Sequence, residues 1–287
     1  MSTITQYLTL WLTFARNSLV RDMTFQVNFL VEFISSIAWV TMYLGFYILI
    51  FQYTDRIGAD NGWGKYEFFV FLATTMIVNS LVQTLFMDNC DELSELIRTG
   101  GLDFALLKPI DTQFLVSLRR VQWSSLGNLL VGVGLLIFSV WTLATREKDP
   151  LEVNPISLVL YPIYVACGVA ILYSLMIALA ATSIWLGRNT SLYDFWFYIT
   201  NFSRYPMEIY DGPWGKPLRL AFTYIIPVLV VVNVPARLLA FPLQPVGSDP
   251  TGVWQLAGFT LLATVASLAA SRWVFLVALG SYRSASS

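Results

Sequence analysis

Residues 65–87 read KYEFFVFLATTMIVNSLVQTLFM, and residues 88–113 continue as DNCDELSELIRTGGLDFALLKPIDTQ. The first stretch carries charge only at its start and is long enough to cross a bilayer as a helix, which needs roughly 20 mainly apolar residues. The second stretch is polar, so we expect the chain to leave the membrane there. This change of composition predicts an all-α, polytopic membrane protein.

The same reasoning extends to the rest of the chain and gives six transmembrane helices. Besides residues 65–87, the predicted spans cover residues 27–53, 114–145, 156–186, 192–210 and 253–279, the fifth being short and interrupted. Together with the segments between them they form one transmembrane domain over residues 1–287.

Two further segments do not read as spans. Residues 4–20 alternate between an apolar and a polar face, which favours a helix in the membrane interface over a frayed start to the first span. Residues 218–239 are apolar but broken by Pro227 and Pro235, with Asn233 between them. Broken backbone is tolerated at membrane depth only inside protein or beside water, so we expect a re-entrant hairpin bent near Pro227.

Composition excludes several classes of function. Of 287 residues, 56% are hydrophobic and 12% charged, whereas soluble domains average about 25% charged residues. The net charge of −1 argues against a nucleic-acid partner. The chain has no histidine, which removes Ser–His and His–metal chemistry. Cys90 and Cys167 lack disulfide or zinc spacing, so we expect neither metal nor cofactor. No cleavable signal is expected at the start of the chain.

Within residues 88–113 the spacing predicts one small amphipathic helix. Its acidic residues lie near its start, where the helix dipole favours them, and Gly100 and Gly101 end it. A groove on a separate motor subunit could grip such a helix, although an ordinary solvated loop fits equally well. The candidate contact residues are Asp91, Glu92, Glu95, Leu96, Ile97, Arg98 and Gly100.

Several short motifs carry a family resemblance. Residues 97–100 read IRTG, residues 102–103 LD, residues 106–110 LLKPI, residues 204–210 RYPMEIY, residues 225–227 IIP and residues 233–236 NVPA. In this order they resemble the signature of a bacterial family of type-2 ABC permeases, with Gly101 standing where a polar or acidic residue would be expected.

The resemblance implies a function and partners. Members have six spans, an interfacial N-terminal helix and a coupling helix between spans two and three. The chain would then be the permease subunit of an ATP-driven exporter in the bacterial inner membrane. It would pair with a second copy or a sister permease and with two ABC ATPase subunits. The ATPase is expected to be separate and the chain itself no enzyme, because residues 62–65 and 212–216 lack the spacing of a phosphate-binding loop.

Polar residues inside predicted spans are costly in lipid and are candidates for function. They are Glu32, Asn79, Gln83, Asn128, Asp194 and Asn201. We take Asn79, Gln83 and Asn201 as candidates for the translocation path. Hydrogen-bonding between helices is the alternative for all of them, and Glu32 and Asp194 fit the cytoplasmic interface as well.

Orientation and class are less constrained. Basic residues barely favour cytoplasmic N- and C-termini, and the pair Arg119–Arg120 makes the loop after the second span the best cytoplasmic candidate. A secondary transporter or channel is the main alternative to an ABC permease, followed by a membrane enzyme or scaffold. Lipid, glycolipid, peptide and drug-like cation all remain open as substrates.

Overall fold

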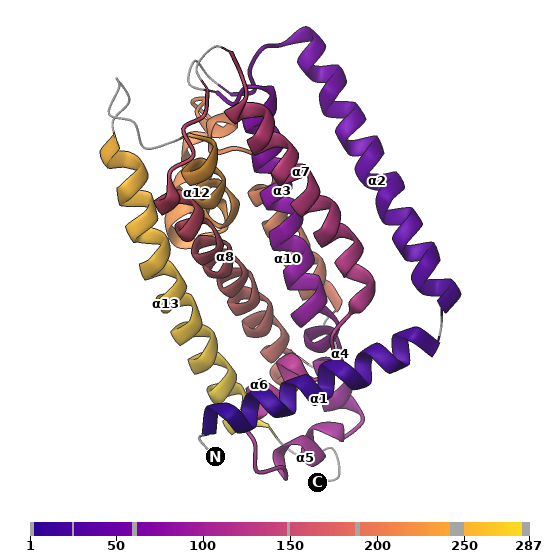
Figure 1. Cartoon of the computed structure of the whole chain (residues 1–287). Helices are drawn as coiled ribbons and strands as arrows, with labels where there is room; N and C mark the ends of the chain where they lie inside the picture. The colour runs from indigo at the N-terminus through magenta and orange to yellow at the C-terminus, as the bar shows by residue number, and fades with distance from the viewer. Residues whose placement is uncertain are drawn as a thin grey trace.

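The computed structural model describes residues 3–24, 26–58, 62–147, 150–186, 190–241 and 250–282. These residues are helical apart from turns, loops and one isolated bridge between Ile57 and Trp63. The all-α prediction is therefore confirmed for the described part of the chain. Five long helices form the body of the bundle (Figure 1): α2 (Gln26–Tyr53), α3 (Lys65–Val82), α7 (Leu126–Ala144), α8 (Pro155–Ala181) and α13 (Pro250–Ser281).

Among the described residues, four helices are long and apolar enough to cross a membrane. They are Lys65–Arg98, Trp123–Ala144, Pro155–Leu186, which includes the short α9 (Ser183–Leu186), and Gly252–Ser281. A fifth candidate, Lys216–Ile225 with Leu229–Ala240, is bent by 92°. Residues 27–53 lie within α2, which contributes the shorter apolar segment Ile37–Tyr53. Six spans thus remains a prediction.

The N-terminal helix α1 (Thr3–Thr24) lies across one end of the bundle (Figure 1), over the region predicted for an interfacial helix. It is tied to the segment before α7: Trp123 Nε1 donates to the carbonyl of Ala15 (3.1 Å) and the Val121 amide donates to Ser18 Oγ (3.2 Å). We call this the α1 end of the bundle, and the opposite end, where Trp63 precedes α3, the Trp63 end.

The polar segment after α3 differs from the expectation. The helix continues without a break from α3 through a π-helical turn η1 (Gln83–Met87) into α4 (Asp88–Arg98). The acidic residues of α4 therefore do not lie at a free helix N-terminus, and the dipole argument for them was wrong. The helix does end as predicted, because Gly100 adopts φ +73°, a conformation that glycine tolerates.

The short helix α5 (Gly101–Leu106) follows at once. A Cβ added at Gly101 would lie 3.0 Å from Leu96 Cδ2. The glycine therefore gives Leu96 room, which is a local reason for the departure from the family motif.

The predicted span 114–145 begins later than expected. Residues 112–118 form a separate helix, α6 (Thr112–Leu118), and a turn η2 (Trp123–Ser125) precedes α7. Between them the backbone bonds to other segments: the Arg120 amide donates to Asn89 Oδ1 (2.9 Å) and the Gln122 amide to the Thr84 carbonyl (2.9 Å). These tertiary bonds replace helical ones and interrupt the helix.

The predicted span 192–210 is not one helix. It consists of α10 (Thr190–Asn201) and two 3₁₀ turns, η3 (Phe202–Arg204) and η4 (Met207–Tyr210). Tyr205 between them is extended (φ −123°, ψ 143°) because the proline that follows it disfavours helical backbone.

Residues 218–239 form two arms joined by a sharp bend. The first arm is α11 (Lys216–Leu220) with a π-helical turn η5 (Ala221–Ile225), and the second is α12 (Leu229–Ala240), with Pro227 in the bend and Pro235 inside α12. The second arm is buried and packs against α3 and α8. A Cβ on Gly168 of α8 would lie 2.7 Å from the Val231 carbonyl oxygen, so this glycine permits the close approach of α12.

Candidate functional site

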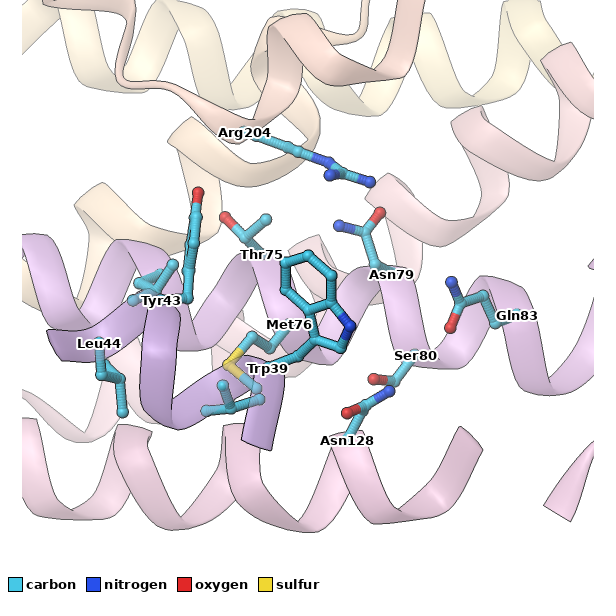
Figure 2. Close-up of a pocket in the computed structure, with 12 residues that line it drawn as sticks. Trp39, Tyr43, Leu44, Thr75, Met76, Asn79, Ser80, Gln83, Asn128 and Arg204 are labelled. Atoms are coloured by element: carbon cyan, nitrogen blue, oxygen red, sulfur yellow. The ribbon is translucent and has the colours of Figure 1, made fainter. Parts of the chain in front are cut away.

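A cavity of about 280 Å³ lies between α2, α3, α7 and η3 (Figure 2). One part of its wall is polar and another apolar. The polar residues are Thr75, Asn79, Ser80, Gln83, Asn128 and Arg204. The apolar and aromatic residues are Trp39, Val40, Tyr43, Leu44, Leu72 and Met76. We call this the α2–α3 cavity.

Helix periodicity places Asn79 and Gln83 on one face of the helix that begins at Lys65. Asn79 lies about 21 Å along that helix from Lys65, at roughly 1.5 Å per residue, which is close to the middle of the helix Lys65–Arg98. The structure brings Asn128 of α7 and Arg204 of η3 to the same cavity. Asn201, the third residue predicted for the path, ends α10 and does not line it.

Three amide side chains and one guanidinium of the cavity have no hydrogen-bond or ion-pair partner among the described residues. Those of Asn79, Gln83 and Asn128 form no hydrogen bond with the described residues. In this structure these three amides therefore do not join helices. Arg204 forms no ion pair in the described part of the chain, and its guanidinium carbon lies 5.4 Å from the centre of the Phe197 ring.

Arg204 is positioned by the break that follows it. The amide of Met207 donates to Asn233 Oδ1 (2.9 Å), and Asn233 Nδ2 donates to the Leu229 carbonyl (2.8 Å). Asn233 is fully buried. Its side-chain oxygen thus accepts the hydrogen bond of the Met207 amide, which has no helical carbonyl as acceptor because the backbone is broken there. Sequence reasoning placed Asn233 in the hairpin but missed that it holds the segment after Arg204.

A buried charged group closes the Trp63 end. Glu208 of η4 pairs with Arg237 of α12 and accepts a hydrogen bond from Trp63 Nε1 (2.8 Å). Trp63 is fully buried, and the Glu208 side chain is 5% exposed. Gly58 (φ +109°) packs so closely that an added Cβ would lie 2.7 Å from Glu208 Cβ. These contacts join the hairpin to the loop between α2 and α3.

At the α1 end, the candidate contact residues of α4 divide into two groups. Asp91, Glu95 and Arg98 are exposed, with an Arg98–Glu95 ion pair of 2.5 Å. Leu96 and Ile97 are half-buried and pack against the core. The predicted apolar contact surface therefore faces the protein to a large extent.

Glu92 has an internal role, because it bridges Arg119 (2.7 Å) and Arg120 (3.0 Å). Asn89 accepts from and donates to the Arg120 backbone. The α4 helix is thereby linked to the segment that leads into α7. Sequence analysis did not predict a role for Asn89. The only signal was its position directly after a predicted span.

Besides apolar residues of α1 such as Leu12 and Val20, the exposed apolar residues at this end include two at the tip of the α4–α5 unit. Phe104 is 72% exposed and Leu107 81%. Sequence analysis noted no contact role for them, although apolar residues within a polar segment were a usable signal.

A further polar link joins α13 to α6. Arg272 Nη2 donates to Asp111 Oδ2 (2.6 Å), and Arg272 Nη1 donates to Gln113 Oε1 (3.0 Å). Burial acts to raise the pKa of the Asp111 carboxyl, but the bonds from Arg272 and from the Phe114 amide outweigh burial and lower it. Arg272 was not among the predicted intramembrane polar residues.

The remaining predicted polar residues lie elsewhere. Asp194 is exposed near the start of α10. Glu32 lies within α2, but its side chain is outside the described residues. Among the described residues, no three His, Cys, Asp or Glu side chains are grouped so as to hold a metal ion.

Comparison with protein families gives one match. Residues 37–286 match the model of a family described as ABC-2 family transporter protein. Comparison with curated proteins and with solved structures gives no match.

Proposed function

Because the chain belongs to the ABC-2 family of transporter proteins, we propose that it is the permease subunit of an ATP-driven exporter in the bacterial inner membrane. Separate ABC ATPase subunits, two for each pair of permeases, would power it. The observation that carries this proposal is the α4–α5 unit at the α1 end, whose tip exposes apolar side chains. The α1 end would face the cytoplasm, with both chain termini on that side.

The tip of α5 is the contact that fits an ATPase best. Phe104 and Leu107 are largely exposed, whereas Leu96 and Ile97 pack against the core. An apolar helix tip that enters a groove on a partner removes this area from water. The exposed side chains of Asp91, Glu95 and Arg98 would form the polar rim of the same contact, which ends at Gly100.

A displacement of α5 would reach the α2–α3 cavity directly. The helix from Lys65 to Arg98 is continuous and carries Asn79 and Gln83 in its middle. Asn89 and Glu92 join the same helix to the segment before α7. Nucleotide-driven movement at the α1 end would therefore shift two walls of the cavity together. The π-helical turn η1, a geometry common at functional sites, lies between the two ends.

The translocation path would run between two permease subunits, walled by α2, α3 and α10. The support comes from α2, where Trp39, Met42 and Phe46 are 68%, 59% and 56% exposed. A second copy, or a sister permease, would cover this face. The hairpin of α11 and α12 would close the outer end as a re-entrant segment.

The decisive test replaces the α5 tip. Phe104→Asp with Leu107→Asp should abolish association with the host's ABC ATPase and the hydrolysis that depends on the permease, because charge cannot enter an apolar groove. Membrane insertion, followed by detergent extraction and size-exclusion chromatography, should be unchanged. ATPase activity of the co-expressed complex is the measurement.

A matched control carries the same kind of charge elsewhere. Val153→Asp alters an exposed residue beyond α7 and should leave hydrolysis intact. Wild-type association and hydrolysis in the α5 double variant would rule out this contact. If Leu96→Asp with Ile97→Asp alone uncouples the complex, the contact is on α4.

A further inference from the structure

We propose that the α2–α3 cavity binds an amphiphile with a single anionic headgroup, a phosphate or carboxylate, and that Arg204 is its charge partner. Such a molecule would be the exported substrate, which rests on the proposed function. The binding site itself is argued from the contacts of the cavity alone.

The charge of the residues that line the cavity determines the charge of the ligand that it can bind. Among the described residues Arg204 is the only charged one that lines it, and it forms no ion pair with any of them. A guanidinium at membrane depth is costly unless it pairs or reaches water. An anion would satisfy it with two parallel hydrogen bonds, which the planar guanidinium forms with carboxylate and phosphate oxygens. A cationic ligand would be repelled.

The amides beside Arg204 complete an oxygen-binding wall. Figure 2 shows the guanidinium pointing toward the side chain of Asn79, with Gln83 one turn further along α3, whereas Asn128 of α7 lies beyond Trp39 in this view. Each amide offers two N–H donors, and none is used within the described part of the chain. The donors of Arg204 and Asn79 thus lie side by side where one charged headgroup would sit, with Gln83 next along the same helix.

The apolar part of the lining requires an apolar portion in the ligand. Trp39, Leu44 and Met76 line the cavity together with the amides, and methionine adapts its shape to varied apolar groups. At about 280 Å³ the cavity is small for a whole lipid, since ligand pockets start at roughly 300 Å³. It fits a headgroup and the first part of a chain. The rest would leave past Trp39, which is 68% exposed.

The test measures binding to the purified permease without any ATPase. Radiolabelled dodecyl phosphate is the probe, in neutral detergent, with unlabelled dodecyltrimethylammonium and inorganic phosphate as competitors. We expect saturable binding that neither competitor displaces at equal concentration. Arg204→Gln should weaken it about tenfold or more, as expected for the loss of a charged hydrogen-bond partner. Arg204→Lys should retain part of it.

Two further variants separate loss of binding from loss of folding. Arg146→Gln removes an exposed arginine paired with Glu67 at the Trp63 end and should bind as the wild type does. Asn79→Leu fills the cavity without changing charge and should also weaken binding. Unchanged binding in both Arg204→Gln and Asn79→Leu would overturn the proposal. Equal competition by dodecyltrimethylammonium would do so too.

If inorganic phosphate displaces the bound dodecyl phosphate, the cavity binds the ion and does not recognise the amphiphile. Because no ATPase is present, failure here leaves the α5 contact untouched. Conversely, loss of the α5 contact would leave binding of dodecyl phosphate intact.

Discussion

Single buried polar residues set the geometry of the broken segments. Asn233 supplies hydrogen bonds to Met207 and Leu229 where the chain after α10 cannot continue as a helix. Glu208 does the same at the Trp63 end, where it holds Arg237 and Trp63 together. In both places one side chain joins α12 to a segment distant in sequence, so these residues position Arg204 and the hairpin without contacting a ligand.

Asn233→Ala should lower the free energy of unfolding by about 1–3 kcal/mol, because the buried Met207 amide would lose its acceptor. Thermal unfolding in detergent, followed by intrinsic fluorescence, is the measurement. Asn17→Ala, at an exposed position of α1, should have almost no effect. Equal unfolding temperatures for the two variants would contradict the role given to Asn233.

The Asp111–Arg272 link should depend on pH. The folded state lowers the pKa of Asp111, so its ionised form adds stability above the unfolded pKa. That contribution is lost as pH falls below about 4 and through the lower folded value. Asp111→Asn should therefore unfold at lower temperature than the wild type at pH 5–8, and the difference should shrink toward pH 3.

Asp194→Asn alters an exposed carboxylate of α10 and serves as the control for this series. Its unfolding temperature should follow the wild type at every pH. A difference between wild type and Asp111→Asn that stays constant down to pH 3 would show that Asp111 ionisation does not stabilise the fold.

At the scale of elements, the helix from Lys65 to Arg98 and the hairpin of α11 and α12 each contribute to more than one region of the protein. The helix from Lys65 to Arg98 lines the cavity along one part and approaches the proposed ATPase contact at its end. The hairpin of α11 and α12 places its apolar second arm, α12, in the protein core. The C-terminus of α12 lies at the Trp63 end of the bundle, where Phe241 packs on Trp63 with ring centres 4.8 Å apart. The second arm is surrounded by protein, whereas the first arm, α11 and η5, is largely exposed, with Ile225 at 79%.

The hairpin should enter and leave on the same, extracytoplasmic side. Single cysteines at Lys216 and Phe241, in a background without Cys90 and Cys167, should both react with a membrane-impermeant maleimide added to intact spheroplasts. A cysteine at Arg98 should react only after the membrane is opened. Labelling of positions 216 and 241 from opposite faces would make the segment a true span and invert α13.

At the scale of the whole molecule, the α2–α3 cavity lies at the edge of the bundle. Helix α2 contributes Trp39 to the cavity wall but exposes most of that side chain, and Figure 1 shows α2 at the edge of the bundle. A single copy therefore leaves the α2 side of this cavity partly exposed. A second permease against α2 would complete it, which agrees with the proposed assembly.

Cysteines at Trp39 or Gln83 should cross-link between permease subunits, to a second copy or to a sister permease. A cysteine at Val78, which is fully buried in α3, should not. Oxidative cross-linking in membranes followed by non-reducing electrophoresis is the measurement. A functional complex with one permease copy, or cross-links confined to one chain, would contradict the assembly.

Hydropathy alone was enough for the helical class, a separate N-terminal helix and the location of most apolar segments, because transfer into lipid depends on local composition. Gly100 was also readable, since a helix end needs a residue that tolerates positive φ. In contrast, the continuity of α3 with α4, the break before α7 and the role of Asn233 depend on bonds between distant segments. The cavity is the clearest case. Asn79 and Gln83 were predictable as neighbours on one helix, but Asn128 and Arg204 join them only because α7 and η3 pack against α3, and no local pattern encodes that contact.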